Sequence, residues 1–238
     1  MLRRWGISVG LALAALLGTA TAQIYLQDDF SGDDSNWVPL WGDWVVEDGV
    51  YKQRSLEINT MSVVADEAWD DSWVEYTFEC RARRVEGPEG FLVMFRLNGM
   101  MQDRGVALAP HPPRMASAPR STQYWWNLGG WANTRSGVER WIDSARVEQG
   151  FQEGHSLELN RWYEIKIENR TDGYALYLDG QLFAEVQDAE VQGGRVGLGS
   201  WATAVEYDDV LVYGPAGPIA TAVSPRDKLA TTWASLKR

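Results

Sequence analysis

The feature that most limits the fold is a two-residue alternation of apolar and polar side chains that recurs along most of the chain. Residues 73–81 place Val74, Tyr76, Phe78 and Cys80 on one side, with charged or polar side chains between them. This spacing is typical of a half-buried strand. Helical spacing is nearly absent before the last dozen residues. The pattern predicts an all-β fold, a sandwich or jelly roll of two antiparallel sheets.

Tight turns separate these runs. Asp48-Gly49 and Asp179-Gly180 each join two strand-like segments, and Asp-Gly is a strong signal for a two-residue hairpin. Residues 90–96 form a nearly continuous apolar run, which is typical of a strand buried on both faces.

The two ends of the chain differ from this pattern. Residues 1–22 carry an early Arg3-Arg4 pair, an apolar stretch and a small-residue cleavage site, which together predict a signal peptide. The apolar stretch is short for a transmembrane helix, and an uncleaved anchor is the alternative. We therefore expect a secreted protein, whether periplasmic, extracellular or at the cell surface, with no transmembrane segment after cleavage.

One sandwich domain is expected over residues 23–214. Residues 98–122 are rich in proline and lack alternation, which predicts a long inserted loop. Residues 215–238 form a C-terminal tail that could carry a short helix. The sequence leaves the oligomeric state open.

The charge of the chain limits the classes of binding partner, and its cysteine content excludes an intramolecular disulfide. The net charge is −11, and without Arg3 and Arg4 the 22 basic residues fall to 20, against 33 acidic ones. Such an acidic surface repels phosphate backbones, so nucleic acid is not an expected partner. Cys80 is the single cysteine, so no intramolecular disulfide can form, and we expect it to be a small buried apolar residue.

Catalytic motifs are missing. There are two histidines, at 111 and 155, and no Gly-x-Ser-x-Gly motif, which argues against a histidine-rich metal site or a hydrolase triad. A retaining glycosidase needs two carboxylates about 5 Å apart. Glu206 and Asp208 come nearest to such a pair, because they are two residues apart on one predicted strand. Glu139 has no second acidic residue at that spacing. We therefore expect no catalytic residues.

Two acidic pairs could serve another purpose. Asp28-Asp29 is expected to open the first strand, and Asp208-Asp209 lies on the last. Terminal strands of jelly rolls are commonly neighbours, and four converging carboxylates would suit a structural Ca²⁺. The alternative is surface charge at strand ends.

Tryptophan is unusually abundant, with 13 in 238 residues. A sandwich core is usually filled by aliphatic residues and phenylalanine, so some indoles should be free to stack on sugar faces. Alternation marks five as structural, namely Trp37, Trp41, Trp44, Trp73 and Trp162.

Residues 124–135 combine indoles with amide, hydroxyl and guanidinium groups, the mixture that sugar binding needs. The candidate ligand-binding residues are Trp125, Asn127, Trp131, Asn133, Arg135, Glu139 and Trp141. The alternative is that these indoles fill a broad core and that Asn133 caps a turn.

Residues 89–95, 124–134, 160–168 and 177–180 resemble, in this order, the concanavalin A-like (laminin-G-like) domain attached to many α-L-arabinofuranosidases. Residues 42–51 also resemble the related 3-keto-disaccharide hydrolase family. The resemblance covers nearly all of residues 28–213 and implies a concanavalin A-like jelly roll that binds plant-type polysaccharide. The catalytic barrel of those enzymes has no counterpart in this sequence, so the resemblance implies no activity.

Three functions follow as hypotheses. The first is a non-catalytic, lectin-like domain for polysaccharide or oligosaccharide. The second is a hydrolase of modified glycosides, with Glu139, Asp143 or Glu206 as acids. The third is a structural envelope protein whose tail docks on a partner.

Overall fold

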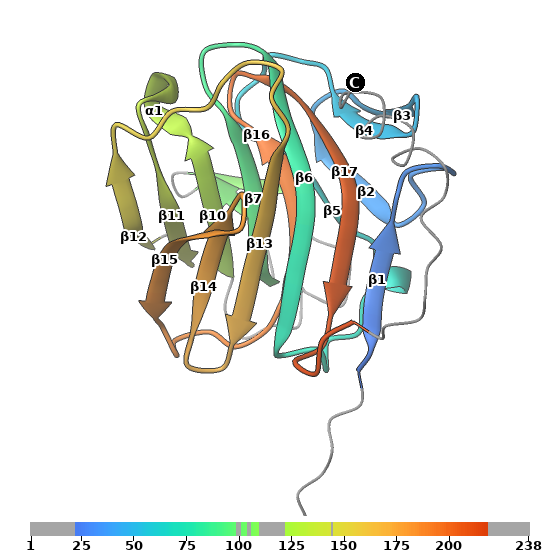
Figure 1. The fold of residues 1–238 in the computed structure, drawn as a ribbon, viewed down its shortest axis with the longest axis vertical. Helices are drawn as coiled ribbons and strands as arrows, with labels where there is room; N and C mark the ends of the chain where they lie inside the picture. The colour runs from blue at the N-terminus through green and yellow to red at the C-terminus, as the bar shows by residue number, and fades with distance from the viewer. Residues whose placement is uncertain (1–21, 99–100, 104–105, 110–121, 144, 219–238) are drawn as a thin grey trace, which may run out of the picture.

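Two antiparallel β-sheets lie face to face in the computed structural model, which describes residues 22–98, 101–103, 106–109, 122–143 and 145–218 (Figure 1). Sheet A contains, in spatial order, β15 (Gln181–Gln187), β14 (Gly173–Leu178), β13 (Tyr163–Arg170), β6 (Tyr76–Glu86), β17 (Ala204–Tyr213), β4 (Val50–Gln53) and β3 (Trp44–Glu47), and β1 (Ile24–Asp28) pairs with β17. Sheet B contains β12 (Ala145–Glu153), β11 (Arg135–Ile142), β10 (Thr122–Gly129), β7 (Phe91–Asn98), β16 (Arg195–Ser200), β5 (Thr60–Val64) and β2 (Trp37–Trp41). The predicted all-β sandwich of two antiparallel sheets is confirmed.

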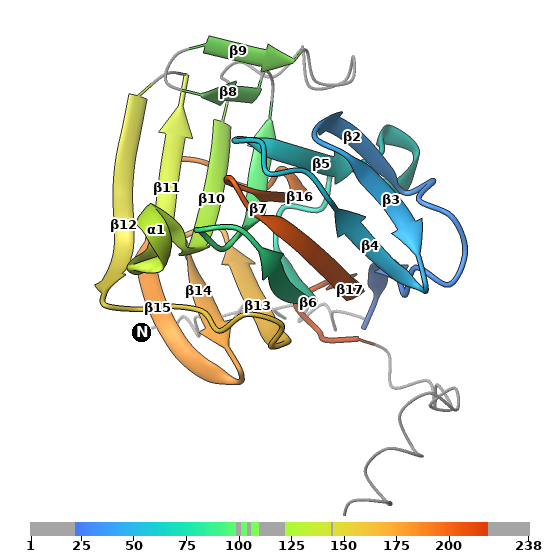
Figure 2. The same cartoon turned by 90° about the horizontal axis from the view of Figure 1, so that it is seen from above.

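Two short helical segments and a small hairpin complete the fold. The 3-10 turn η1 (Asp66–Ala68) follows β5, and the short turn α1 (Gly130–Asn133) joins β10 to β11. Strands β8 (Met101–Asp103) and β9 (Val106–Ala109) pair with each other beyond the ends of β10 and β11 (Figure 2). The segment expected as one long loop over 98–122 therefore contains two strands.

Several predictions fall outside the described residues. They are the signal peptide, apart from residue 22, and the tail, apart from residues 215–218. Within the part of the chain that the structure describes, no helix is both long and apolar enough to cross a membrane.

Both Asp-Gly hairpins form as predicted. Asp48 and Gly49 have φ of 57° and 70°, and Asp179 and Gly180 have φ of 49° and 73°. Positive φ at both central residues defines the hairpin turn whose twist matches the flanking strands. These turns pair β3 with β4 and β14 with β15.

The main core lies between the sheets, where alternation places one side chain in two from each strand. Tyr76, Phe78 and Cys80 of β6 are buried as the sequence predicted, and Ala82 continues this face, whereas Val74 precedes the strand and is only partly buried. Burial raises the pKa of the Cys80 thiol, so it stays protonated and unreactive.

A second apolar cluster covers the opposite, outer face of sheet B. It consists of Met61, Val63, Leu92, Met94, Leu97 and Trp125, with Val38 and Leu40 packed against it. Because β7 contributes to both clusters, its side chains are buried on both faces, as its continuous apolar sequence predicted.

A buried arginine joins the two sheets. Arg96 ends the apolar part of β7 in sheet B and is 0% exposed. Its guanidinium donates to Asn169 Oδ1 at 2.6 Å and to the carbonyl oxygens of Arg170 and Gly173, both at 2.8 Å, on sheet A. It also donates to the carbonyl oxygen of Asp188 at 3.0 Å. The sequence pattern places Arg96 at the end of the apolar run 90–96 but does not indicate these contacts.

The carboxylate of Asp188 extends this link. Its Oδ2 accepts hydrogen bonds from Gln149 at 2.9 Å and from Arg140 at 3.2 Å, both on sheet B. Burial raises the pKa of the Asp188 carboxyl, but the hydrogen bonds from Gln149 and the Glu190 backbone and the charge of Arg140 outweigh it, so the net pKa is lowered. The ionised form is therefore the one that stabilises the fold.

We expect Arg96→Met to lower the free energy of unfolding by about 3–5 kcal/mol, because it leaves four buried acceptor oxygens without their donor and removes one of the two cations near the Asp188 carboxylate. Urea unfolding followed by fluorescence measures this loss. Arg54→Met is the control, because Arg54 pairs with Asp43 at the surface, where such pairs contribute about 1 kcal/mol or less. Equal losses in the two variants would contradict the central role of Arg96.

Asp188→Asn should reduce stability at neutral pH and flatten its acid dependence. Because the folded-state pKa of Asp188 is lowered, its contribution is present above the unfolded-state value of about 3.9 and is lost as pH falls through the folded-state pKa. The difference between wild type and variant should therefore shrink in urea titrations run from about pH 6 down to about pH 3. The exposed Asp71→Asn control should keep the wild-type slope; a D188N difference independent of pH would refute the assignment.

Candidate functional site

The predicted ligand-binding residues gather on the outer face of sheet B. In β10, Trp126 and Leu128 point into the main core, so Trp125 and Asn127 lie on the opposite face. In β11, Glu139 and Trp141 share that face, and Glu139 is the register partner of Trp125. Neighbouring indoles of β10 thus point to different faces, as alternation along a strand requires, although both are buried.

The two indoles of this face are more buried than expected. Trp125 is 1% exposed and Trp141 is 6% exposed, and their ring centroids lie 6.1 Å apart. The indole nitrogen Nε1 of Trp125 is buried without a hydrogen-bond partner. A buried, unpaired N–H costs about 1–3 kcal/mol, which the apolar packing around Trp125 must offset.

A charged network lies beside these rings. Arg146 Nη2 donates to Glu139 Oε1 at 2.6 Å and to Glu148 Oε1 at 2.7 Å. Arg135 Nη2 donates to the same Glu148 oxygen at 2.9 Å. We call Trp131, Arg135, Glu139, Arg146 and Glu148 the outer-face cluster.

Trp131 is the half-exposed indole of the cluster. The Arg135 guanidinium lies 3.9 Å from its ring centroid, which is a cation–π contact. Phe151 packs edge-on against the same ring at 5.2 Å, and the Arg146 guanidinium lies at 5.7 Å. The indole therefore stands next to fixed hydrogen-bonding groups, as the sequence predicted for this segment.

The turn that carries Trp131 has an unusual backbone. Trp131, Ala132 and Asn133 have φ of 50°, 57° and 59°, so the turn is left-handed. This conformation costs about 1–2 kcal/mol for each L-residue other than glycine. Strain of this kind persists only where the surroundings enforce it, and it concentrates at functional sites.

Asn133 is one of the groups that hold this turn. Its amide donates to the carbonyl oxygen of Leu157 at 2.9 Å and accepts from the Leu157 N–H at 2.8 Å. The Ala132 N–H donates to Glu89 at 3.2 Å. These contacts fit the alternative expected from the sequence, in which Asn133 holds a turn, because its side chain is committed to the backbone of a distant loop. A role of Asn133 as a sugar ligand stays a prediction. Asn127 is 8% exposed and lies directly beneath Gly130.

Glu139 has a perturbed titration. The residue is 8% exposed, and burial raises its pKa although the charge of Arg146 opposes this. Glu139 and Glu148 share one guanidinium nitrogen, so two carboxylates approach each other closely on this face. The sequence treated Glu139 as a lone acid because the partner lies on the next strand.

The acidic pairs proposed for Ca²⁺ do not converge. Strands β1 and β17 are neighbours as expected, but Asp28 closes β1 rather than opening it. Asp28 accepts hydrogen bonds from Phe30 and Trp37, whereas Asp208 and Asp209 both pair with Arg81 at 2.7 Å. Over the described ranges, three or more metal-ligating side chains come together nowhere. The expected four-carboxylate geometry, which also included Asp29, is wrong, and a structural Ca²⁺ stays a prediction.

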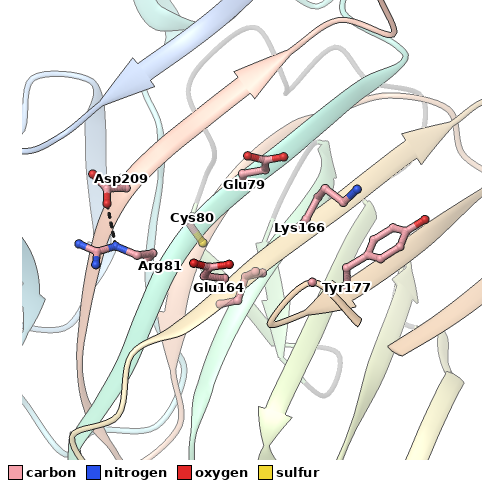
Figure 3. Close-up of a pocket in the computed structure, with 9 residues that line it drawn as sticks. Glu79, Cys80, Arg81, Glu164, Lys166, Tyr177 and Asp209 are labelled. Carbon is pink, nitrogen blue, oxygen red and sulfur yellow. Dashed lines mark ion pairs between the residues drawn. The ribbon is translucent and has the colours of Figure 1, made fainter. Parts of the chain in front are cut away.

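A groove of about 480 Å³ lies on the outer face of sheet A (Figure 3). Arg81 pairs there with Asp209. Lys166 binds Glu168 at 2.7 Å and lies 4.0 Å from the Tyr177 ring centroid. The two cations of the groove, Arg81 and Lys166, are thus neutralised by neighbouring carboxylates, and the groove favours no particular ligand.

Of the five indoles expected to be structural, Trp37 is buried, and Trp44 and Trp73 are partly buried against the main core. The other two do not enter the core. Trp41 is 55% exposed at the end of β2, and the half-exposed Trp162 is covered by the guanidinium groups of Arg81 and Arg83. Alternation predicts the face of a strand, but it does not show whether that face is covered.

Comparison with known proteins places this geometry in context. No protein-family profile matches the chain. An extracellular exo-α-L-arabinofuranosidase from Streptomyces chartreusis is 38% identical over 157 residues, which cover 66% of this chain and 16% of that enzyme. The chain therefore spans only about a sixth of the length of this relative. The expected link to 3-keto-disaccharide hydrolases stays a prediction.

Solved structures share the architecture. The carbohydrate binding module CBM66 from Bacillus subtilis superposes with a TM-score of 0.56 at 16% identity, over 74% of this chain and 94% of that one. A β-1,3-1,4-glucanase (lichenase) derived from a mouse hindgut metagenome gives 0.55 at 13% identity, over 80% and 98%. The chain therefore has the concanavalin A-like lectin/glucanase fold and partial homology to an arabinofuranosidase.

Proposed function

We propose that this chain is an exported carbohydrate-binding domain without catalysis of its own, and that the outer-face cluster binds the sugar. The observation that carries the proposal is the half-exposed Trp131 ring held beside Arg135 and Arg146. An indole supplies apolar surface for the C–H groups of a sugar, and fixed guanidinium and carboxylate groups supply hydrogen bonds for its hydroxyls.

The ligand class follows from charge and from the relative. The chain carries a net charge of −11, which disfavours polyanionic polysaccharides. Homology to part of an extracellular arabinofuranosidase supports a neutral, arabinose-containing plant polysaccharide such as arabinoxylan as the ligand. It also supports export of this chain.

Trp131→Ala should weaken arabinoxylan binding about tenfold or more, because aromatic anchors at a binding site typically contribute at least 1.4 kcal/mol. Isothermal titration calorimetry with arabinoxylan oligosaccharides measures the change. Trp41→Ala is the matched control, since it removes an indole that is 55% exposed on β2, away from the cluster. Absence of binding across a broad glycan panel, or equal effects of the two variants, would overturn the proposal.

Hydrolysis is the second candidate, and one observation favours it: Glu139, whose pKa is raised, and Glu148 share the Arg146 guanidinium. A retaining glycosidase uses two carboxylates about 5 Å apart, with one protonated. A cation between the two acids, however, stabilises both of them in the ionised form, and this works against a general acid.

We therefore expect the purified chain to release neither reducing sugar nor keto-sugar from arabinoxylan or 3-keto-disaccharides. Glu139→Gln should leave this background unchanged while weakening sugar binding. Release that disappears in the Glu139→Gln variant, but persists in the surface control Glu158→Gln, would establish the hydrolase instead.

A further inference from the structure

A second pocket, distant from the outer-face cluster in sequence, opens at the edge of sheet A. It has a volume of about 550 Å³, within the range of roughly 300–1,000 Å³ that is typical of small-ligand sites. Strand β1 forms one side, and the segment around η1 lies beside it (Figure 1). We call this the edge pocket; its informative lining residues are Tyr25, Gln27, Asn36, Glu67, Trp69 and Trp73.

Aromatic rings form one wall of the edge pocket. Tyr25 and Trp73 stack with centroids 4.4 Å apart and planes only 4° from parallel, and both are half-buried. Trp69 meets Trp73 edge-on at 5.1 Å and a plane angle of 73°. The stacked pair thus presents a rigid apolar surface that is still partly open to solvent.

Three lining residues of the edge pocket carry polar groups without partners. Trp69 is 3% exposed, and its indole N–H has no hydrogen-bond partner. Leaving such a donor buried and unpaired costs about 1–3 kcal/mol. The side chains of Gln27 and Glu67 are exposed and hold neither a hydrogen bond nor an ion pair to any residue that the structure describes.

Asn36 adds an oriented amide. Its Nδ2 donates to Asp28 Oδ2 at 3.2 Å, which fixes the side chain and leaves its carbonyl oxygen as an acceptor. Strand β1 also pairs with β17 alone among the described strands, so its other edge, next to the pocket, keeps backbone groups that can bond a ligand.

Charge then selects the ligand. The lining includes the carboxylates of Glu67 and Asp70 and neither lysine nor arginine. Such a site repels uronates, phosphates and other anions. The pocket combines an apolar ring surface with hydrogen-bond donors and acceptors and has no cation. This combination suits a neutral molecule rich in hydroxyl groups.

We propose that the edge pocket is a second carbohydrate-binding site, which takes a neutral sugar residue between the Tyr25–Trp73 stack and the Glu67 carboxylate, with the exposed Gln27 amide donating to a hydroxyl. The site is independent of the outer-face cluster, because none of their side chains is shared. A chain with both sites binds polysaccharide at two points, so its apparent affinity for polymer exceeds that for a short oligosaccharide.

Indole N–H signals test the proposal directly. Two-dimensional ¹H–¹⁵N NMR of the chain resolves tryptophan Nε1–H resonances, which single Trp→Phe variants assign. Titration with arabino-, xylo- and gluco-oligosaccharides should shift the Trp69 and Trp73 signals in a saturable way. In the Trp131→Ala variant, these shifts should persist while binding at the outer-face cluster is lost.

Two surface variants keep the test independent of folding. Glu67→Gln and Gln27→Ala change exposed side chains, and each should weaken the titration of the Trp69 signal about threefold to tenfold, as loss of one hydrogen bond predicts. Glu57→Gln, another exposed carboxylate, should have no effect. Wild-type affinity in both Glu67→Gln and Gln27→Ala would overturn the proposal.

The pattern of shifts separates the two sites. Shifts confined to Trp125, Trp131 and Trp141 would refute the edge pocket and leave the outer-face proposal intact. Shifts confined to Trp69 and Trp73 would do the reverse. If no indole signal shifts with any oligosaccharide, both proposed sites are refuted. If the Trp69 signal shifts with an unrelated extended peptide but with no sugar, the edge pocket is a protein-binding site instead.

Discussion

The buried guanidinium of Arg96 is the interaction on which the sandwich depends. It starts on sheet B and donates to acceptors at the ends of sheet A strands and at Asp188. A buried charge is tolerable only when its hydrogen-bonding capacity is filled, so the two sheets must meet in one register to supply these acceptors. Hydrophobic packing alone would permit small shifts between the sheets; the arginine does not.

The same network reaches the functional face through one strand. Arg140 in β11 points to the inner side and binds Asp188, whereas its neighbours Glu139 and Trp141 lie on the outer face. Because side chains of a strand alternate, fixing Arg140 fixes the position of both neighbours. The outer-face cluster is thus positioned from behind by the contacts that hold the sheets together.

The sequence predicted local structure better than it predicted sites. Alternation and the Asp-Gly turns were sufficient for the strands and hairpins, because both depend on residues close together in the chain. The pairing of Glu139 with Arg146, and the use of Asn133 by Leu157, depend on which strands and loops become neighbours in space. The burial of Trp125 likewise depends on a second apolar cluster on the outer side of sheet B, which alternation within one strand cannot reveal.

The left-handed turn at 130–133 has a consequence for engineering. Its backbone opposes the preference of L-residues, and it is held by Glu89 and Leu157, which are far away in sequence. A linear peptide with the sequence of residues 129–135 would relax to a right-handed or extended form, and its indole would lose its orientation. The Trp131 platform can therefore be transplanted to another scaffold only together with both of its distant anchors.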